Sequence, residues 1–295
     1  MRNTPTRHRR VTIPRPTRSV WLLAKAWLTG LMDRPRPSVG PDTLLFVPGA
    51  AGDGVWYDGL VRGLWRGGVR DRVETFAWGG PTPLVLLNAM SDSVHADAEE
   101  QLCRRIAQLR AQDPRARITL LGHSAGAGVV LGALARLAPE VTVRRVVILG
   151  AMMSSDYDLA PALAHVEAAA HVFVSDRDTV FLDRIARLIG TYDHAHAPAA
   201  GFRGFRTDEL PDALRRKVVQ HPYDPAWQLL GNDGGHFGTE IDAFAAHVLA
   251  PLLIERRVYG PHRWVRSTPP PAAVPQRARQ QAMRRGERAV TSLAS

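Results

Sequence analysis

Short apolar runs alternate along the middle of this chain with longer segments in which apolar residues recur at helical spacing. Each short run is followed by a turn-forming or polar stretch, as expected at the end of a buried strand. The runs that predict strands are residues 43–47, 72–78, 118–121, 144–149, 171–174 and 216–220. The segments that predict helices are residues 93–111, 125–137, 179–189 and 240–253. This alternation predicts an α/β fold with a mostly parallel central sheet and helices on both faces.

Five residues at the end of one predicted strand indicate a catalytic nucleophile. Gly122-His123-Ser124-Ala125-Gly126 directly follows the apolar run at 118–121, and small or aliphatic residues continue the chain as a helix. A Gly-x-Ser-x-Gly sequence at a sharp turn from strand to helix is typical of a nucleophile elbow. The glycines let the strand and the helix approach closely, so the serine is held outward on a strained corner. Ser124 is therefore predicted to be a nucleophile, and the alternative is an ordinary helix N-cap.

Across about residues 41–254, the order of elements and the Gly122–Gly126 motif resemble the α/β-hydrolase fold. The resemblance implies a serine hydrolase in which nucleophile, acid and histidine follow in that chain order. α/β-Hydrolases often have two further strands before the one predicted here at 43–47, and residues 1–40 contain no counterpart of them. No large cap insertion is evident either. A minimal α/β-hydrolase core is therefore expected.

A histidine that can serve as general base is expected on a loop after the last strand. The loop Asn232-Asp233-Gly234-Gly235-His236-Phe237-Gly238 has this position, and among the eleven histidines only His236 has such a setting. His123 adjoins the serine, but neighbouring side chains on an elbow point in different directions. We therefore expect His236 to be the base and His123 to pack or to orient its neighbours.

Three aspartates are alternatives for the acid that holds the histidine tautomer. Asp176 and Asp178 lie in the polar loop after the strand at 171–174, and Asp156 follows the preceding strand. Hydrolases similar to this chain place their acid three residues beyond a small residue that ends this strand. Ser175 is that small residue, so the resemblance favours Asp178, with Asp176 and Asp156 as the other options.

An oxyanion hole needs two backbone N–H groups directed at one oxygen. One donor is expected from Ala125, the residue after the nucleophile, and the other from the glycine-rich loop after Val47, where Ala50 is favoured over Gly49 and Ala51. Related hydrolases often have His-Gly here, whereas this chain has Pro48-Gly49. Neither a phosphate-binding loop pattern nor a dinucleotide-binding pattern is present, and no metal constellation stands out, so no cofactor is expected.

The net charge of +10 belongs to the two ends of the chain. Residues 1–40 carry +8, residues 255–295 carry +7, and residues 41–254 carry −5. We expect a basic Pro/Arg-rich arm at 1–40 with a short apolar segment at 20–32, and a disordered basic tail at 255–295. Solvated arms are the simpler interpretation, and contact with an anionic membrane surface is the alternative. No module for sequence-specific nucleic-acid binding is evident, and the expected location is the cytoplasm, with membrane association as an option.

The predicted activity is cleavage of a carboxylic ester or related acyl bond, in the manner of an esterase or lipase, through an acyl-enzyme on Ser124. A small-molecule or lipid-like ester is the expected substrate. Thioesterases and acyltransferases use the same machinery, so both stay open. A non-catalytic binding module with the same fold is the competing class.

Overall fold

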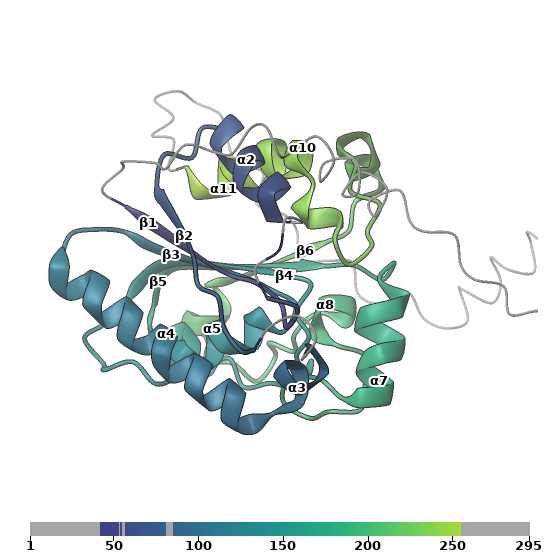
Figure 1. Cartoon of the computed structure of the whole chain (residues 1–295), viewed down its shortest axis with the longest axis horizontal. Coiled ribbons are helices and arrows are strands. Elements are labelled where there is room, and N and C mark those ends of the chain that lie inside the picture. The colour runs from purple at the N-terminus through teal and green to yellow at the C-terminus, as the bar shows by residue number, and fades with distance from the viewer. Residues whose placement is uncertain (1–41, 53, 55–56, 81–84, 255–295) are drawn as a thin grey trace, which may run out of the picture. The chain divides into compact units, whose positions relative to one another are not determined.

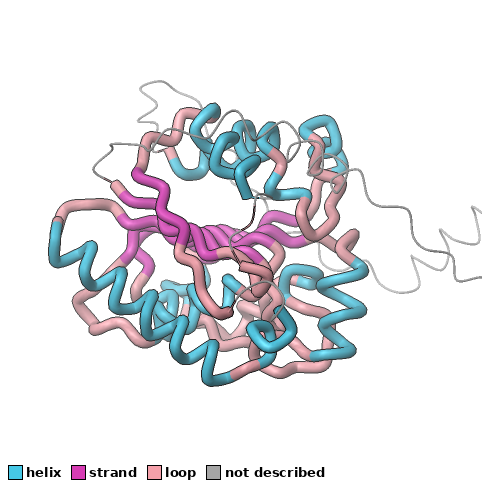
Figure 2. The backbone as a smooth tube through the Cα atoms, viewed as in Figure 1, coloured by secondary structure: helices cyan, strands magenta, loops and turns pink. Residues whose placement is uncertain are grey.

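The computed structural model describes residues 42–52, 54, 57–80 and 85–254. The basic arm with its apolar segment and the basic tail lie outside the described residues, so their expected behaviour stays a prediction. Six parallel strands form one central sheet in the order β2-β1-β3-β4-β5-β6 (Figures 1 and 2). The strands are β1 (Thr43–Val47), β2 (Arg72–Thr75), β3 (Ile118–His123), β4 (Val143–Leu149), β5 (Val166–Val174) and β6 (Val218–Pro222). The predicted parallel α/β sheet is confirmed.

Helices cover both faces of the sheet (Figure 1). On one face lie α2 (Asp58–Arg66), α10 (Asp242–Phe244), the π-helical η6 (Ala245–Leu249) and α11 (Ala250–Leu253). On the other face lie α3 (Val85–Met90), α4 (Asp92–Gln112), α5 (Gly126–Ala135), α6 (Ala160–Ala164), the π-helical η3 (Thr179–Ile185), α7 (Ala186–Ile189) and α8 (Ala200–Arg203). The remaining turns are α9 (Asp212–Arg215) and the 3-10 helices η4 (Pro225–Leu230) and η5 (Gly238–Glu240). Within the described part, no helix has the length and apolar character needed to cross a membrane.

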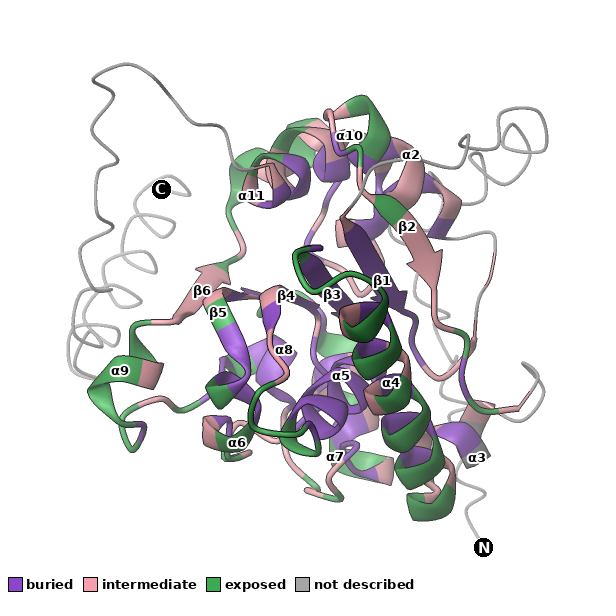
Figure 3. Ribbon diagram, turned by 90° about the vertical axis from the view of Figure 1, so that its left-hand side faces the viewer, coloured by how far each residue is buried: buried purple, intermediate pink, exposed green. Residues whose placement is uncertain are grey.

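Alternation along the strands divides the core into two layers. In β1, Leu44 and Phe46 pack with the α2 side, whereas Leu45 and Val47 pack with the α4 and α5 side. All four side chains are at most 1% exposed. Because helices cover both faces of the sheet, β1 and β3 are buried along their whole length (Figure 3). Strands buried in this way have continuous apolar sequences and not alternating ones.

Helix α2 has no counterpart among the predicted helices, because its glycines resemble helix breakers. In the fold they serve close packing: a Cβ at Gly63 would collide with the main-chain oxygen of Asp242, and a Cβ at Gly59 would lie 2.7 Å from that of Glu240. Helix α2 therefore lies directly against the segment that follows His236.

Several predicted elements differ in detail from the observed ones. Strand β5 begins at Val166, five residues earlier than expected, because its alanines at 168–170 weaken the strand pattern. Strand β2 ends at Thr75 and not at residue 78. The single helix expected over 240–253 is a succession of 3-10, α and π turns.

A histidine pair between β5 and β6 is expected to make the stability of the fold depend on pH. His171 Nδ1 lies 3.0 Å from His221 Nε2, and burial, with His221 as the second cause, lowers the pKa of His171 to about 4. The unfolded chain protonates His171 below about pH 6.5, whereas the folded chain protonates it only below about pH 4. Stability is therefore complete above pH 6.5 and falls towards pH 4, by up to about 3 kcal/mol for this group.

Replacing His171 should remove this loss of stability at low pH. We expect His171→Phe to show a shallower decline of the unfolding free energy between pH 6.5 and 4 than the wild type, measured by urea unfolding at each pH. Equal declines in the two proteins would exclude His171 as the source.

Candidate active site

Ser124 occupies the corner between β3 and α5. Its φ of +55° lies in the left-handed region, where a residue with a side chain is strained by roughly 1–3 kcal/mol. The corner is clamped from both sides: the Ser124 N–H donates to the Leu149 oxygen at 3.0 Å, and the Met152 N–H donates to the Ser124 oxygen at 3.2 Å. The predicted strained elbow is present, and surrounding main chain holds it in place.

The two glycines of the motif are needed for close approach. A Cβ at Gly122 would lie 2.9 Å from the Gly126 oxygen, so the strand and the helix pack without side chains between them. A Cβ at Gly126 would collide with the main-chain oxygens of Val47 and Pro48. Gly126 therefore lets the loop after β1 lie directly against the elbow.

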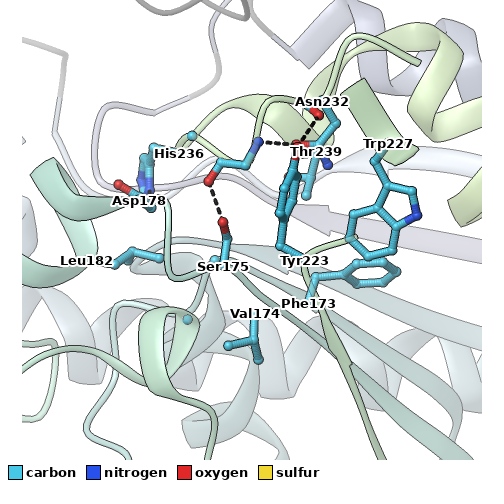
Figure 4. Close-up of a pocket in the computed structure, with 14 residues that line it drawn as sticks. Phe173, Val174, Ser175, Asp178, Leu182, Tyr223, Trp227, Asn232, His236 and Thr239 are labelled. Atoms are coloured by element: carbon cyan, nitrogen blue, oxygen red, sulfur yellow. Dashed lines mark hydrogen bonds and ion pairs between the residues drawn. The ribbon is translucent and has the colours of Figure 1, made fainter. Parts of the chain in front are cut away.

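The structure brings Ser124, His236 and Asp178 into one line of hydrogen bonds. Ser124 Oγ lies 3.0 Å from His236 Nε2, and His236 Nδ1 lies 2.6 Å from Asp178 Oδ2. With the proton on Nδ1, His236 donates to the carboxylate and accepts from the serine, which is the tautomer that a general base needs. The Asp178 side chain is 3% exposed and that of His236 is 5% exposed. Figure 4 shows Asp178 and His236 side by side.

Both carboxylate oxygens of Asp178 have a donor. Its Oδ1 accepts the Phe181 N–H at 3.1 Å and so caps η3, while Oδ2 faces His236. The Phe181 ring also stacks on the His236 imidazole, with 4.5 Å between centroids and 17° between planes. The segment from Asp178 to Phe181 therefore sets both the tautomer and the plane of the histidine. Phe181 was not among the predicted site residues, since nothing in a helical apolar pattern distinguishes it.

The other two aspartates lie elsewhere. Asp176 is exposed. Asp156 Oδ1 pairs with Arg206 at 3.0 Å, and its side chain is 68% exposed. Neither contacts His236, so of the three alternatives the geometry selects Asp178.

Several polar contacts hold the loop that carries His236. Ser175 Oγ donates to the Gly234 oxygen at 2.5 Å, and Asn232 Oδ1 accepts the Gly234 N–H at 2.9 Å. Tyr223 Oη donates to the Asn232 oxygen at 3.1 Å. These residues line a cavity of about 20 Å³, and Figure 4 shows Ser175, Tyr223 and Asn232 among its lining residues. That volume holds about one water molecule, which is too little for an ester substrate.

Of the two predicted oxyanion donors, Ala125 directly follows the serine, and Ala50 follows Gly49, where a Cβ would lie 3.1 Å from Ser124 Cβ. Within the described residues, no protein acceptor is recorded for the N–H of Ala50 or of Ala125. Asn88 Nδ2 donates to the Ala50 oxygen at 3.0 Å, and Trp78 Nε1 donates to the Pro48 oxygen at 2.8 Å. These contacts tie down the far side of the loop and leave the Ala50 N–H available. No group of three or more acidic, histidine or cysteine side chains in the described part is arranged to hold a metal ion.

Comparisons with known proteins found one family match and several similar solved structures. A family described as alpha/beta hydrolase matches residues 59–188, and no curated protein matches the chain. Among solved structures, the chain is similar to a lipase-esterase related protein from Clostridium acetobutylicum, at 13% identity over 73% of this chain and 94% of that one, with a TM-score of 0.43. It is also similar to the esterase domain of a Rhodothermus marinus protein, at 17% identity over 75% and 89% of the two chains, with a TM-score of 0.42.

Proposed function

Because this chain belongs to the α/β-hydrolase superfamily, we propose that it is a serine hydrolase that cleaves carboxylic esters through an acyl-enzyme on Ser124. The observation that carries the proposal is the pair of distances through His236: 3.0 Å to Ser124 Oγ and 2.6 Å to Asp178 Oδ2. A serine, an imidazole and a buried carboxylate in this order are what nucleophilic acyl transfer requires.

In the first half of the reaction, Ser124 Oγ attacks the ester carbonyl carbon while His236 Nε2 takes the hydroxyl proton. The imidazolium that forms is stabilised by the Asp178 carboxylate. The carbonyl oxygen becomes negative and accepts hydrogen bonds from the N–H groups of Ala125 and Ala50. The carbon–oxygen bond to the alcohol then breaks, and His236 returns its proton to the leaving alcohol.

The second half repeats these roles with water. His236 takes a proton from the water that attacks the acyl-enzyme, the acid is released, and Ser124 regains its proton. Two half-reactions through one intermediate predict a burst of alcohol when the second half is slower than the first.

The test uses the purified full chain with p-nitrophenyl esters of increasing acyl length and with matched acyl thioesters. We expect turnover of esters with a burst close to one p-nitrophenol per protein molecule. Preference for the thioester would move the assignment to a thioesterase. A folded protein that turns over neither class would contradict the proposal and favour a binding module.

A further inference from the structure

Asn88, in α3, is a buried amide whose hydrogen-bonding groups all face main chain. It is 1% exposed. Its Oδ1 accepts the Gly80 N–H at 2.8 Å, and its Nδ2 donates to the Gly80 oxygen at 2.9 Å. Nδ2 also donates to the Ala50 oxygen at 3.0 Å. Asn88 therefore joins the turn at Gly80 to the loop after β1.

These partners determine which way round the Asn88 amide lies. Two of the three main-chain groups around it are carbonyl oxygens, which only accept hydrogen bonds, and the third is an N–H, which only donates. Turning the amide over would bring its oxygen against both carbonyl oxygens. A carboxylate of the same size would have the same conflict, because it has no hydrogen to give to Ala50. The contact with Ala50 therefore depends on an amide at this position.

The main chain of Asn88 is itself held by α4. Its oxygen lies 2.8 Å from His95 Nε2, which must carry the hydrogen because a carbonyl oxygen only accepts. His95 is 4% exposed, and its ring stacks on that of Tyr192, with 3.7 Å between centroids and 13° between planes. Tyr192 Oη in turn donates to Glu99 Oε1 at 2.9 Å. Asn88 therefore reaches Ala50 from a buried and well-anchored support.

The contact with Ala50 bears on the direction of the Ala50 N–H. The Gly49 oxygen, on the same peptide group as that N–H, accepts the Gly52 N–H at 3.0 Å. This peptide is trans, so its N–H points away from its C=O and thus away from Gly52. Asn88 holds the next carbonyl along the chain. The Ala50 N–H therefore cannot turn without breaking one of these two hydrogen bonds.

Two other residues of the loop have supports of their own. Tyr57 Oη accepts the Gly49 N–H at 3.0 Å and lies 3.1 Å from the Nδ1 of His123, the residue before the serine. The Pro48 oxygen accepts from Trp78 Nε1 at 2.8 Å. The loop therefore keeps two attachments when the amide contact is removed.

We propose that Asn88 is a positioning residue for the oxyanion hole: its amide holds the Ala50 oxygen so that the Ala50 N–H faces the oxygen that becomes negative when Ser124 attacks. The inference rests on the proposed function, because the oxyanion forms only if Ser124 attacks an acyl substrate. Asn88 touches no reacting atom and acts through Ala50. Donors in an oxyanion hole bind the transition state more strongly than the substrate, so loss of Asn88 should lower kcat and leave KM little changed.

Asn88→Asp tests the role with almost no change in size. Its carboxylate still accepts the Gly80 N–H, but it sets an oxygen against the Ala50 oxygen. We expect kcat for p-nitrophenyl esters to fall by about 10–100-fold with KM within about threefold, a smaller loss than removal of an oxyanion donor itself. Asn88→Ala removes the amide without adding repulsion, and we expect kcat to fall by about 10-fold. It supplies the result if Asn88→Asp does not fold.

Gln220→Glu is the matched control. The Gln220 amide also makes a pair of contacts with the main chain of one residue: Oε1 accepts the Phe205 N–H at 2.8 Å, and Nε2 donates to the Phe205 oxygen at 3.0 Å. It belongs to β6, the edge strand on the side of the sheet away from β1. We expect Gln220→Glu to lower Tm as Asn88→Asp does and to leave kcat unchanged.

Two ketone inhibitors distinguish positioning from a general loosening of the fold. Ser124 Oγ adds to the carbonyl carbon of a trifluoromethyl ketone, His236 takes the hydroxyl proton, and the carbonyl oxygen becomes the anion that the oxyanion donors bind. The methyl ketone of the same chain length binds without this addition. In both Asn88 variants, we expect Ki for the trifluoromethyl ketone to rise by about the factor by which kcat/KM falls. Ki for the methyl ketone should stay within about threefold.

The outcomes distinguish this inference from the proposed function. Full kcat in a folded Asn88 variant, an equal rise of Ki for both ketones, or an equal loss of kcat in Gln220→Glu would overturn the inference while ester hydrolysis by the wild type stands. If the wild type hydrolyses neither esters nor thioesters and adds no trifluoromethyl ketone, the proposed function fails and the positioning role fails with it.

Hydrogen exchange in the wild type decides the matter if neither Asn88 variant folds. Both hydrogens on Asn88 Nδ2 are bound to carbonyl oxygens, so in NMR spectra they should exchange much more slowly than those of Gln101, an exposed amide on α4. Slow exchange supports the inference, and exchange as fast as that of Gln101 would overturn it.

Discussion

Ser124→Ala is expected to lower kcat for ester hydrolysis by about 10⁴-fold or more, because it removes the atom that forms the acyl-enzyme. The elbow itself should survive, since the clamping contacts of Ser124 at 3.0 and 3.2 Å are made by its main chain. We therefore expect an unchanged fold by circular dichroism and an unchanged Tm. The measurement compares the initial rates of wild type and Ser124→Ala on p-nitrophenyl esters at equal protein mass.

Ser93→Ala is the matched control, because Ser93 is an exposed serine near the start of α4. It should leave kcat within the error of the wild type. If Ser124→Ala kept most of the activity, Ser124 would be a structural corner and another nucleophile would have to be sought.

Asp178→Asn is expected to lower kcat by about 10⁴-fold, the loss typical of this change in serine proteases. The reason for this loss is that two donors, Phe181 N–H and His236 Nδ1–H, face the Asp178 carboxylate. The amide oxygen is needed by the Phe181 N–H at 3.1 Å, which turns the amide NH₂ towards His236 Nδ1. His236 would then keep its hydrogen on Nε2 and could no longer accept the proton of Ser124.

Asp176→Asn is the control for this prediction, because Asp176 is an exposed residue of the same loop. It should leave kcat unchanged. Loss of activity in Asp176→Asn or in Asp156→Asn, with Asp178→Asn active, would reassign the acid.

Local rules were sufficient to predict the elbow. The glycines at 122 and 126 mark a close approach of backbone to backbone, and the collisions that a Cβ would cause at both positions account for that pattern. The loop of His236 was also predictable, since its glycines and its place after the last strand are local features. The grouping of Ser124, His236 and Asp178 follows from parallel strands that end at one edge of the sheet.

Contacts that depend on distant packing could not be predicted in this way. Helix α2 was missed because its glycines lower helix propensity, and their use as packing contacts appears only when the segment after His236 lies against them. Glu240 reads as an ordinary helix-start residue in the sequence. Its complete burial depends on how that segment and His123 meet, 117 positions apart in the chain.

The choice of Asp178 over Asp176 shows where prediction from the sequence ends and the structure is needed. Both residues stand in the same polar loop, two positions apart, and composition does not separate them. The resemblance favoured Asp178, and the physical reason lies in η3: a residue that caps this helix through Phe181 N–H is buried beneath it and directed at His236.

The central claim is that Ser124 is a nucleophile activated by His236. It is tested most directly by incubating the purified full chain with a fluorescent fluorophosphonate and locating the label by peptide mass spectrometry. The account predicts labelling of the wild type on Ser124, and no labelling of folded Ser124→Ala or His236→Ala. A folded wild type that stays unlabelled, or equal labelling of Ser124→Ala, would contradict it.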